Sequence, residues 1–182
     1  MATAQAESTI PGGTWQSDPV HSTVGFAVRH AVGTFRGGFG QFEASLGDSS
    51  GEPRLSGHVP VESVEVKEEN LETHLLSPEF FDRDRTPEIT FESSKVTHED
   101  GTLVVEGELT VKGNSRKVVA TGDINGPIPG PDGNDRLGID LATIVDRHVF
   151  GLDWNMDMPD GSKILGDEVT LTVHLELIKE RD

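Results

Sequence analysis

Hydrophobic and polar residues alternate along most of this sequence. In residues 23–30, Val24, Phe26 and Val28 fall on one face and small or polar residues on the other, a period of two that predicts a β-strand. The same alternation returns in residues 42–46, 59–66, 89–93, 105–111, 118–124, 137–145 and 169–177. Turn signals such as Asp100-Gly101 separate these runs. The pattern predicts about eight antiparallel strands.

One region follows a helical pattern instead. Residues 68–76 place Leu71 and Leu75 four positions apart, which is the spacing of one helix face. The next residues, 77–81, contain Ser, Pro and two Phe and predict a short turn. A short helical insertion among strands is therefore expected.

Glycine and proline mark three further irregular places. Residues 33–40 have Gly at four of eight positions, which predicts a bent or bulged strand. Pro60 lies inside an apolar run and favours an edge position or a bulge. Residues 126–135 contain three Pro and three Gly and predict a loop.

These elements fit two all-β architectures. Eight antiparallel strands in about 165 ordered residues form either an up-and-down barrel or a sandwich. The last run, Val169 to Leu177, spans about 27 Å at the usual rise of a strand, and strands of this length favour the barrel. We therefore expect an all-β protein with a short helical insertion. It would have a disordered N-terminal arm over residues 1–13 and a single barrel domain over residues 14–180.

The net charge restricts the classes of partner. The 182 residues include 15 Lys and Arg against 32 Asp and Glu, a formal charge of −17 at pH 7. A balance this negative disfavours nucleic acid and anionic membrane surfaces. No stretch approaches the roughly 20 apolar residues of a membrane-spanning helix, and residues 1–18 lack the pattern of a secretory signal. We expect an acidic, cytoplasmic protein without stable membrane insertion.

Residues with catalytic or metal-binding chemistry form no known motif. The chain has no Cys, and its seven His lack the spacing of zinc motifs. Residues 153–164 have Met158 and Ile164 at the positions where a calcium loop requires Gly and Glu. No Ser lies in a G-x-S-x-G motif, and no helix signal or Lys-Ser/Thr follows the glycines of residues 37–40. We expect no metal, no cofactor and no enzymatic activity.

The aromatic residues are concentrated in one half of the chain. Seven of the eight Phe lie between residues 26 and 91. In a closed barrel, an inner face rich in Phe and Val makes either a dry packed core or an apolar cavity, and both stay open at this point. Phe35 and Phe39 favour a ligand-binding wall because the glycines beside them leave room near the backbone.

Four linked motifs resemble the YceI-like family. They are the opening strings Asp18-Pro19-x-His21-Ser22, Phe26-x-Val28-x-His30 and Gly33-x-Phe35-x-Gly37-x-Phe39, the central segment 63–93, Gly107-x-Leu109-Thr110-Val111-x-Gly113, and Asp146-Arg147-x-x-Phe150-Gly151. The resemblance runs in order from about Trp15 to Leu177. It implies a lipocalin-like, eight-stranded antiparallel barrel with helices over one end. It also implies binding of polyisoprenoids, isoprenoid quinones or related lipids, and allows a homodimer.

On this basis the leading hypothesis is a non-enzymatic protein that carries or sequesters a long apolar ligand, such as a polyisoprenoid or quinone. The Leu71/Leu75 pair is expected to form a lid over the barrel mouth. The expected cavity wall comprises Phe26, Val28, Phe35, Phe39, Phe42, Leu76, Phe80, Phe81, Ile89, Phe91, Leu109 and Phe150, with His21, His30 and His148 as candidates to bind a polar head.

Some of these residues have a second interpretation. His21, with Asp18, can instead stabilise the first turn. Arg147 can form a structural ion pair with Asp146 or Asp153 in place of binding a head group. Two other classes of function also stay open: an enzyme that acts on an apolar small molecule with a His as base, and a stress-related interaction module without a ligand.

Overall fold

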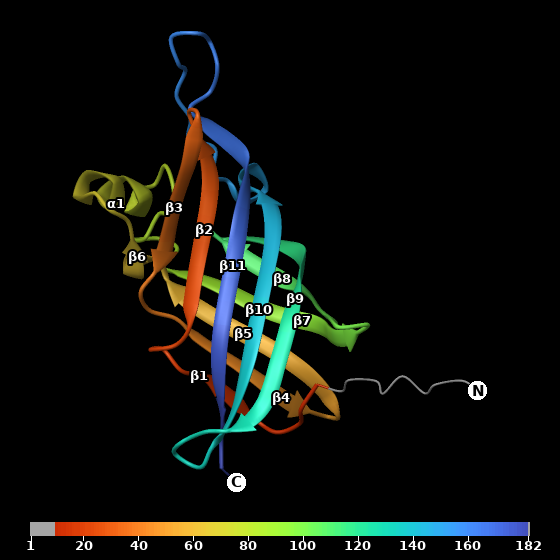
Figure 1. Cartoon of the computed structure of the whole chain (residues 1–182). Coiled ribbons are helices and arrows are strands. Elements are labelled where there is room, and N and C mark those ends of the chain that lie inside the picture. The colour runs from red at the N-terminus through yellow and green to blue at the C-terminus, as the bar shows by residue number, and fades with distance from the viewer. Residues whose placement is uncertain (1–9, 182) are drawn as a thin grey trace.

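The structure, a computed structural model, describes residues 10–181, with the side chains of residues 48 and 49 left aside. The expected disordered arm, residues 1–13, lies mostly outside this range, and Ile10 within it packs against the hydrophobic core. The elements labelled in Figure 1 are β1 (Trp15–Ser17), β2 (Thr23–His30), β3 (Gly33–Phe39), β4 (Glu43–Ser49), β5 (Glu52–Pro60), η1 (Val61–Ser63), β6 (Val64–Glu65), α1 (Glu69–Leu76), β7 (Glu88–Glu99), β8 (Thr102–Val111), β9 (Asn114–Pro129), β10 (Asp135–Asp146), η2 (Arg147–Phe150) and β11 (Leu165–Lys179).

Antiparallel pairing closes these strands into a barrel. β1 pairs with β4 on one side and with the end of β11 on the other, which closes a ring of eight strands in the order β1, β4, β5, β7, β8, β9, β10, β11. β2 pairs with the first part of β11, β3 pairs with β2, and β6 pairs with the end of β3. The prediction of an eight-stranded antiparallel barrel is confirmed, and the sandwich alternative is wrong.

Alternation decides which side chains face the interior. In β8, Leu103, Val105, Leu109 and Val111 are buried, whereas Glu108 between them is exposed. Successive residues of a pleated strand point to opposite faces, so the apolar set forms the inner surface. Asp18 is the only buried carboxylate among the described residues. The other carboxylates of the described residues are therefore at least partly exposed on the exterior.

The segment rich in Pro and Gly forms a shorter loop than predicted. Residues 126–129 continue β9, where Ile128 pairs with Arg136 and Pro129 with Asp135. β8 pairs with β9 only as far as Gly122, so beyond that point β9 has a free edge within residues 10–181. Proline is tolerated on a free edge because its missing N–H is not needed there. The prediction of a loop over residues 126–135 is correct only for residues 130–134.

The glycine-rich strand is regular, and the predicted helix is confirmed. β2 and β3 pair without a break from Val24 with Phe39 to His30 with Gly33, so this pair contains no bulge, and the chain turns instead at residues 40–42. Pro60 ends β5 and lies opposite Glu88 of β7. The pairing of β5 with β4 ends at His58, so Pro60 has a free edge on its other side among the described residues, as the edge prediction expects. The helix predicted over residues 68–76 is α1.

Two hydrophobic clusters make up the core of the barrel. One, which includes Trp15, Leu103 and Leu177, packs the end where β1 closes the ring. The other includes residues of α1 and η2 and lies toward the opposite end. Figure 1 shows α1 beside β3 and the segment before β11, residues 151–164, projecting from the top of the barrel. None of the helices described within residues 10–181 has the length and apolar character to span a bilayer.

Candidate ligand-binding cavity

The barrel encloses a cavity of about 690 Å³. This volume lies within the range of about 300–1,000 Å³ typical of small-molecule sites. At roughly 30 Å³ for a group the size of a water molecule, it has room for roughly twenty methylene groups. Its wall is mainly apolar and includes residues of every long strand, of α1 and of η2. The interior is therefore a cavity and not a fully packed core.

Most of the predicted site residues lie on this wall. They are Phe26, Val28, Phe35, Phe39, Phe42, Phe80, Phe81, Ile89, Phe91, Leu109 and Phe150, together with His30. Leu76, His21 and His148 do not reach the cavity. Leu76 packs against the neighbouring cluster, and the two histidines take part in polar contacts elsewhere on the barrel.

Two Phe rings of the wall lie against glycines of a neighbouring strand. A Cβ on Gly37 would lie 2.5 Å from Cζ of Phe26, and one on Gly107 would lie 2.6 Å from Cζ of Phe91. Both rings line the cavity. Glycine at these two positions therefore lets the rings lie close to the sheet, and this leaves open space in the middle of the barrel.

α1 supplies one side of the cavity. Glu68 caps the helix by accepting hydrogen bonds from the backbone N–H groups of Asn70 and Leu71 at 3.0 and 2.9 Å. Leu71 and Leu75 both line the cavity. The inward face is thus the one that their spacing predicted, and Leu75 occupies the place on the wall that was expected for Leu76.

His74 connects α1 to the projecting segment. Its Nε2 lies 2.5 Å from a carboxylate oxygen of Glu79. Its ring packs edge-on against Phe80 and Trp154, with ring centroids 4.9 and 4.8 Å away. The side chains of His74, Phe80 and Trp154 all border the cavity. The helix and the segment before β11 therefore meet in one aromatic contact on the cavity wall.

The cavity reaches the surface beside β3. His30, Gly33 and Thr34 lie on its wall and are exposed. Only Gly38 and Phe39 of β3 pair with β6, so the first part of β3 has a free edge in the part of the chain that the structure describes. The space between this edge and α1 is the candidate mouth.

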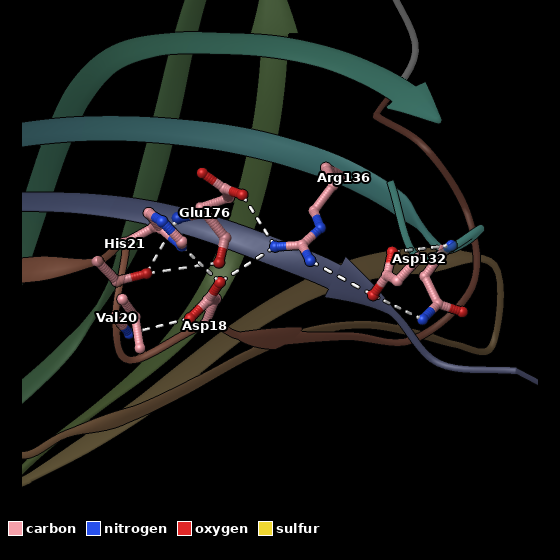
Figure 2. A network of polar contacts seen from close by, with 8 residues as sticks. Asp18, Val20, His21, Asp132, Arg136 and Glu176 are labelled. Carbon is pink, nitrogen blue, oxygen red and sulfur yellow. Dashed lines mark hydrogen bonds and ion pairs between the residues drawn. The ribbon is translucent and has the colours of Figure 1, made fainter. Parts of the chain in front are cut away.

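A network of polar contacts joins the turn after β1 to β10 and β11 (Figure 2). A carboxylate oxygen of Asp18 lies 2.8 Å from Nδ1 of His21 and accepts a hydrogen bond from Arg136 at 3.0 Å. Arg136 also pairs with Glu176 at 2.9 Å and with Asp132 at 3.3 Å. The contact with His21 lowers the pKa of Asp18, and Asp18 in turn raises the pKa of His21.

This network resembles a metal site only in part. Ligand atoms of Asp18, His21 and Glu176 lie within 4.8 Å of one another. However, the guanidinium of Arg136 contacts both carboxylates and already supplies the positive charge that they attract. The contacts therefore agree with the structural interpretation of His21, as a residue that fixes the first turn.

His148 fastens the projecting segment to β11. Its Nδ1 lies 2.8 Å from a carboxylate oxygen of Asp153, and its Nε2 lies 2.8 Å from one of Asp167. These contacts, the one with Asp153 first, raise the pKa of His148. When both ring nitrogens carry a proton, the imidazolium can donate to both carboxylates. The residue thus lies on the outside of the barrel and joins two segments.

Arg147 differs from its neighbour in being buried, with 3% of its surface exposed. Its Nε donates to the backbone oxygen of Gly166 at 2.8 Å. Its Nη1 donates to the backbone oxygens of Leu152 and Trp154 at 2.5 and 2.8 Å. No carboxylate among the described side chains lies within 4.0 Å of the guanidinium, because Asp153 pairs with His148 instead. The expected ion pair of Arg147 is therefore wrong.

Several wall residues were not predicted. Val145, Val169 and Leu171 follow the same alternation as the predicted strands, so the sequence contained the signal for them. Trp154 lies outside the strands, where no period shows which side chain faces inward. Arg147, which the sequence analysis considered as a head-group ligand, also lines the cavity, from η2.

Comparisons with known proteins agree with this architecture. The model of the YceI-like domain matches residues 15–177. A UPF0312 protein of Staphylococcus aureus strain N315 is 29% identical over 164 residues, which cover 87% of this chain and 94% of that protein.

Two solved structures share the fold. BcnA of Burkholderia cenocepacia superposes with a TM-score of 0.74 at 19% identity and covers 90% of this chain and 99% of its own. A polyisoprenoid-binding domain from Saccharophagus degradans superposes with a TM-score of 0.72 at 9% identity and covers 93% and 100%. At these identities the likeness concerns the fold.

Proposed function

This chain belongs to the YceI-like family, and from its cavity we propose that it binds one long apolar molecule inside the barrel. The proposed ligand is a polyisoprenoid, an isoprenoid quinone or a similar lipid. The proposed role is to carry or sequester this lipid without changing it chemically. The observation that carries the proposal is the apolar cavity of about 690 Å³ with its candidate mouth beside β3.

The energy of transfer from water is sufficient for such a role. Each buried methylene group contributes about 0.8 kcal/mol. About ten of them reach the binding free energy of a micromolar complex before ordering costs are subtracted. The fold neighbour that is a polyisoprenoid-binding domain supports the choice of ligand class. The cytoplasmic location and the homodimer stay predictions.

Cavity occupancy tests the proposal directly. Protein purified from its native host is denatured and extracted with organic solvent, and the extract is analysed by mass spectrometry. We expect about one polyprenyl or quinone molecule per chain. Extracts without such a lipid from several hosts, together with no thermal shift from added geranylgeraniol or quinone, would show that the proposal is wrong.

A matched pair of variants locates the binding site. Ala120 lines the cavity, whereas its neighbour Val119 is 52% exposed on the outer face of β9. Ala120→Trp fills part of the cavity, and we expect the affinity for geranylgeraniol to decrease about tenfold or more. Val119→Trp adds the same side chain outside and should change the affinity less than about twofold. Equal effects of the two variants would place binding outside the barrel.

An activity assay tests the alternative that the protein is an enzyme. His30 is the predicted histidine that lies on the cavity wall. An apolar substrate that the protein turns over, with activity lost in His30→Ala, would favour an enzyme over a carrier.

A further inference from the structure

We infer that Arg147 is the head-group site of the cavity, and that the bound molecule carries an anionic oxygen, as a carboxylate or a phosphate, at the end of its apolar chain. This inference rests on the proposed lipid-binding function and specifies the class of ligand. Its basis is the bonding of the guanidinium and the position of this group at the cavity wall.

The guanidinium is held in a fixed position. Three backbone oxygens, those of Gly166, Leu152 and Trp154, accept hydrogen bonds from its Nε and Nη1. They lie at both ends of the projecting segment, which fixes the group between the segment and β11. Backbone oxygens satisfy N–H groups but carry no net charge, so the positive charge of Arg147 has no anionic group in direct contact.

One nitrogen of the group lacks a partner. Nη2 is buried and makes no hydrogen bond to any residue between 10 and 181. Buried N–H groups and buried charges in proteins are nearly always paired, because water is not there to solvate them. Burial also lowers the pKa of Arg147, the direction expected for a cation withdrawn from water, although arginine stays protonated. An anionic ligand oxygen would supply the missing partner.

The nearest acidic side chains are engaged elsewhere. Asp153 and Asp167 both contact His148 at 2.8 Å, and Asp146 accepts the backbone N–H of His148 at 2.9 Å. All three are exposed to solvent and lie more than 4.0 Å from the guanidinium. They attract Arg147 only from that distance, where solvent weakens the interaction.

The position of Arg147 suits a head group. It borders the cavity together with Leu152, Trp154 and Leu165, which are apolar. Nη2 itself is covered, so a ligand oxygen reaches it only when neighbouring atoms are displaced. The segment 151–164 contains no helix or strand and one isolated bridge, between Asp157 and Lys163, and such a segment can yield locally.

Ligands with one tail and different heads test this inference. Hexadecanoate, hexadecyl phosphate, hexadecanamide and hexadecanol are titrated at pH 8 into the full chain after lipid extraction. We expect one or both anions to bind about tenfold or more tightly than hexadecanol, because hydrogen bonds to charged groups are the stronger ones. A preference for hexadecanoate indicates a fatty acid, and a preference for the phosphate indicates a polyprenyl phosphate.

The outcomes separate the two proposals. If none of the four compounds and no geranylgeraniol binds, the proposed lipid-binding function fails. If geranylgeraniol binds and neither anion does, lipid binding stands and the role of Arg147 is overturned. If hexadecanol binds as tightly as both anions, lipid binding stands and the role of Arg147 is overturned.

Variants then assign the preference to Arg147. Arg147→Met should reduce the ratio of anion to alcohol affinity to less than about threefold and leave the affinity for hexadecanol nearly unchanged. Arg136→Met is the matched control, since Arg136 is also largely buried but lies outside the cavity, and it should keep the full ratio. An unchanged ratio in Arg147→Met overturns the inference.

A measurement on the unmodified protein covers the case in which Arg147→Met does not fold. The Nε–H signal of Arg147 in a protein with labelled arginine should shift when hexadecanoate or hexadecyl phosphate binds, and shift much less with hexadecanol. Equal shifts with the three ligands would overturn the inference.

Discussion

Gly37 and Gly107 both support a Phe ring of the cavity wall, but they differ in what else lies nearby. The atoms closest to a Cβ on Gly37 are three atoms of the Phe26 ring. Those closest to a Cβ on Gly107 include the backbone oxygen of Glu92 as well as the Phe91 ring. A ring can rotate into an open cavity, whereas a paired backbone cannot move alone. The same substitution should therefore have different results at the two positions.

We expect Gly37→Ala to fold and to bind less ligand. Phe26 would move into the cavity, so the affinity for geranylgeraniol should decrease while the free energy of unfolding changes by less than about 1 kcal/mol. Gly107→Ala should lower the free energy of unfolding by about 1–3 kcal/mol. Urea unfolding and ligand titration measure the two effects. If Gly107→Ala is as stable as the unmodified protein, the contact of the added Cβ with the backbone oxygen of Glu92 does not destabilise the fold.

The raised pKa of His148 predicts a dependence of stability on pH. In the unfolded chain histidine titrates near about pH 6.5. Because Asp153 and Asp167 raise the folded pKa, the stabilising contribution is fully present below the unfolded value and is lost as pH rises through the folded one. The pKa of His21 is raised by Asp18 in the same direction. Stability should therefore decrease as pH rises above about 6.5.

Substitution of His148 isolates its share of this effect. His148→Gln should flatten the decrease in the urea midpoint between pH 6.5 and 8.5, and should speed hydrogen exchange in residues 151–164. His98→Gln is the control, since no carboxylate among the described side chains lies within 4.0 Å of His98. A pH profile unchanged in His148→Gln would assign the effect to other groups.

At the scale of elements, α1 depends on its cap. Only Leu75 of this eight-residue helix is buried, so packing alone holds it weakly. Glu68→Ala removes both capping hydrogen bonds and should cost about 1 kcal/mol. Amides of α1 should then exchange about fivefold faster with solvent, and bound lipid should dissociate faster because α1 borders the candidate mouth.

Hydrogen-exchange mass spectrometry measures the change in amide exchange. Glu69→Ala, one position on, should change exchange much less, and an equal change would contradict a role for the cap.

Elements with local signals were predictable from the sequence. α1 follows from the spacing of Leu71 and Leu75, and the strands follow from alternation over neighbouring residues. The extension of β9 over Ile128 and Pro129 was not predictable, because proline is tolerated there only since β8 has already ended. That condition depends on another strand and leaves no local pattern.

The residues of the candidate site also differ in whether the sequence could predict them. The Phe positions of the wall share the strand alternation, so most of them could be named from the sequence. The bonds of Arg147 could not, because its partners are backbone oxygens, one of them Gly166, 19 residues away. Any residue type supplies a backbone oxygen, so no side-chain pattern marks such a partner.

For the whole molecule, charge and apolar character are separated in space. Most apolar positions of the strands face the interior, and among the described residues every carboxylate except that of Asp18 is at least partly exposed to solvent, in a chain whose net charge is −17. We expect slower loading with geranylgeraniol from anionic vesicles than from neutral ones at low salt, because like charges repel. At high salt the difference should disappear through screening. Stopped-flow measurements of transfer from vesicles to the protein give the loading rate from anionic and from neutral vesicles. Equal rates at low salt would show that the exterior charge does not affect loading.

Because β11 closes the ring, the barrel can form only after β11 has been synthesised. β11 pairs with β1, β2 and β10, all of which are synthesised before it. Until β11 leaves the ribosome, the nascent barrel is open and its inner apolar face is uncovered, a state prone to aggregation. Pairing between the two ends of the domain also makes folding slow. The cavity therefore exists only after β11 has been made, and a ligand of the proposed kind can enter only the finished domain.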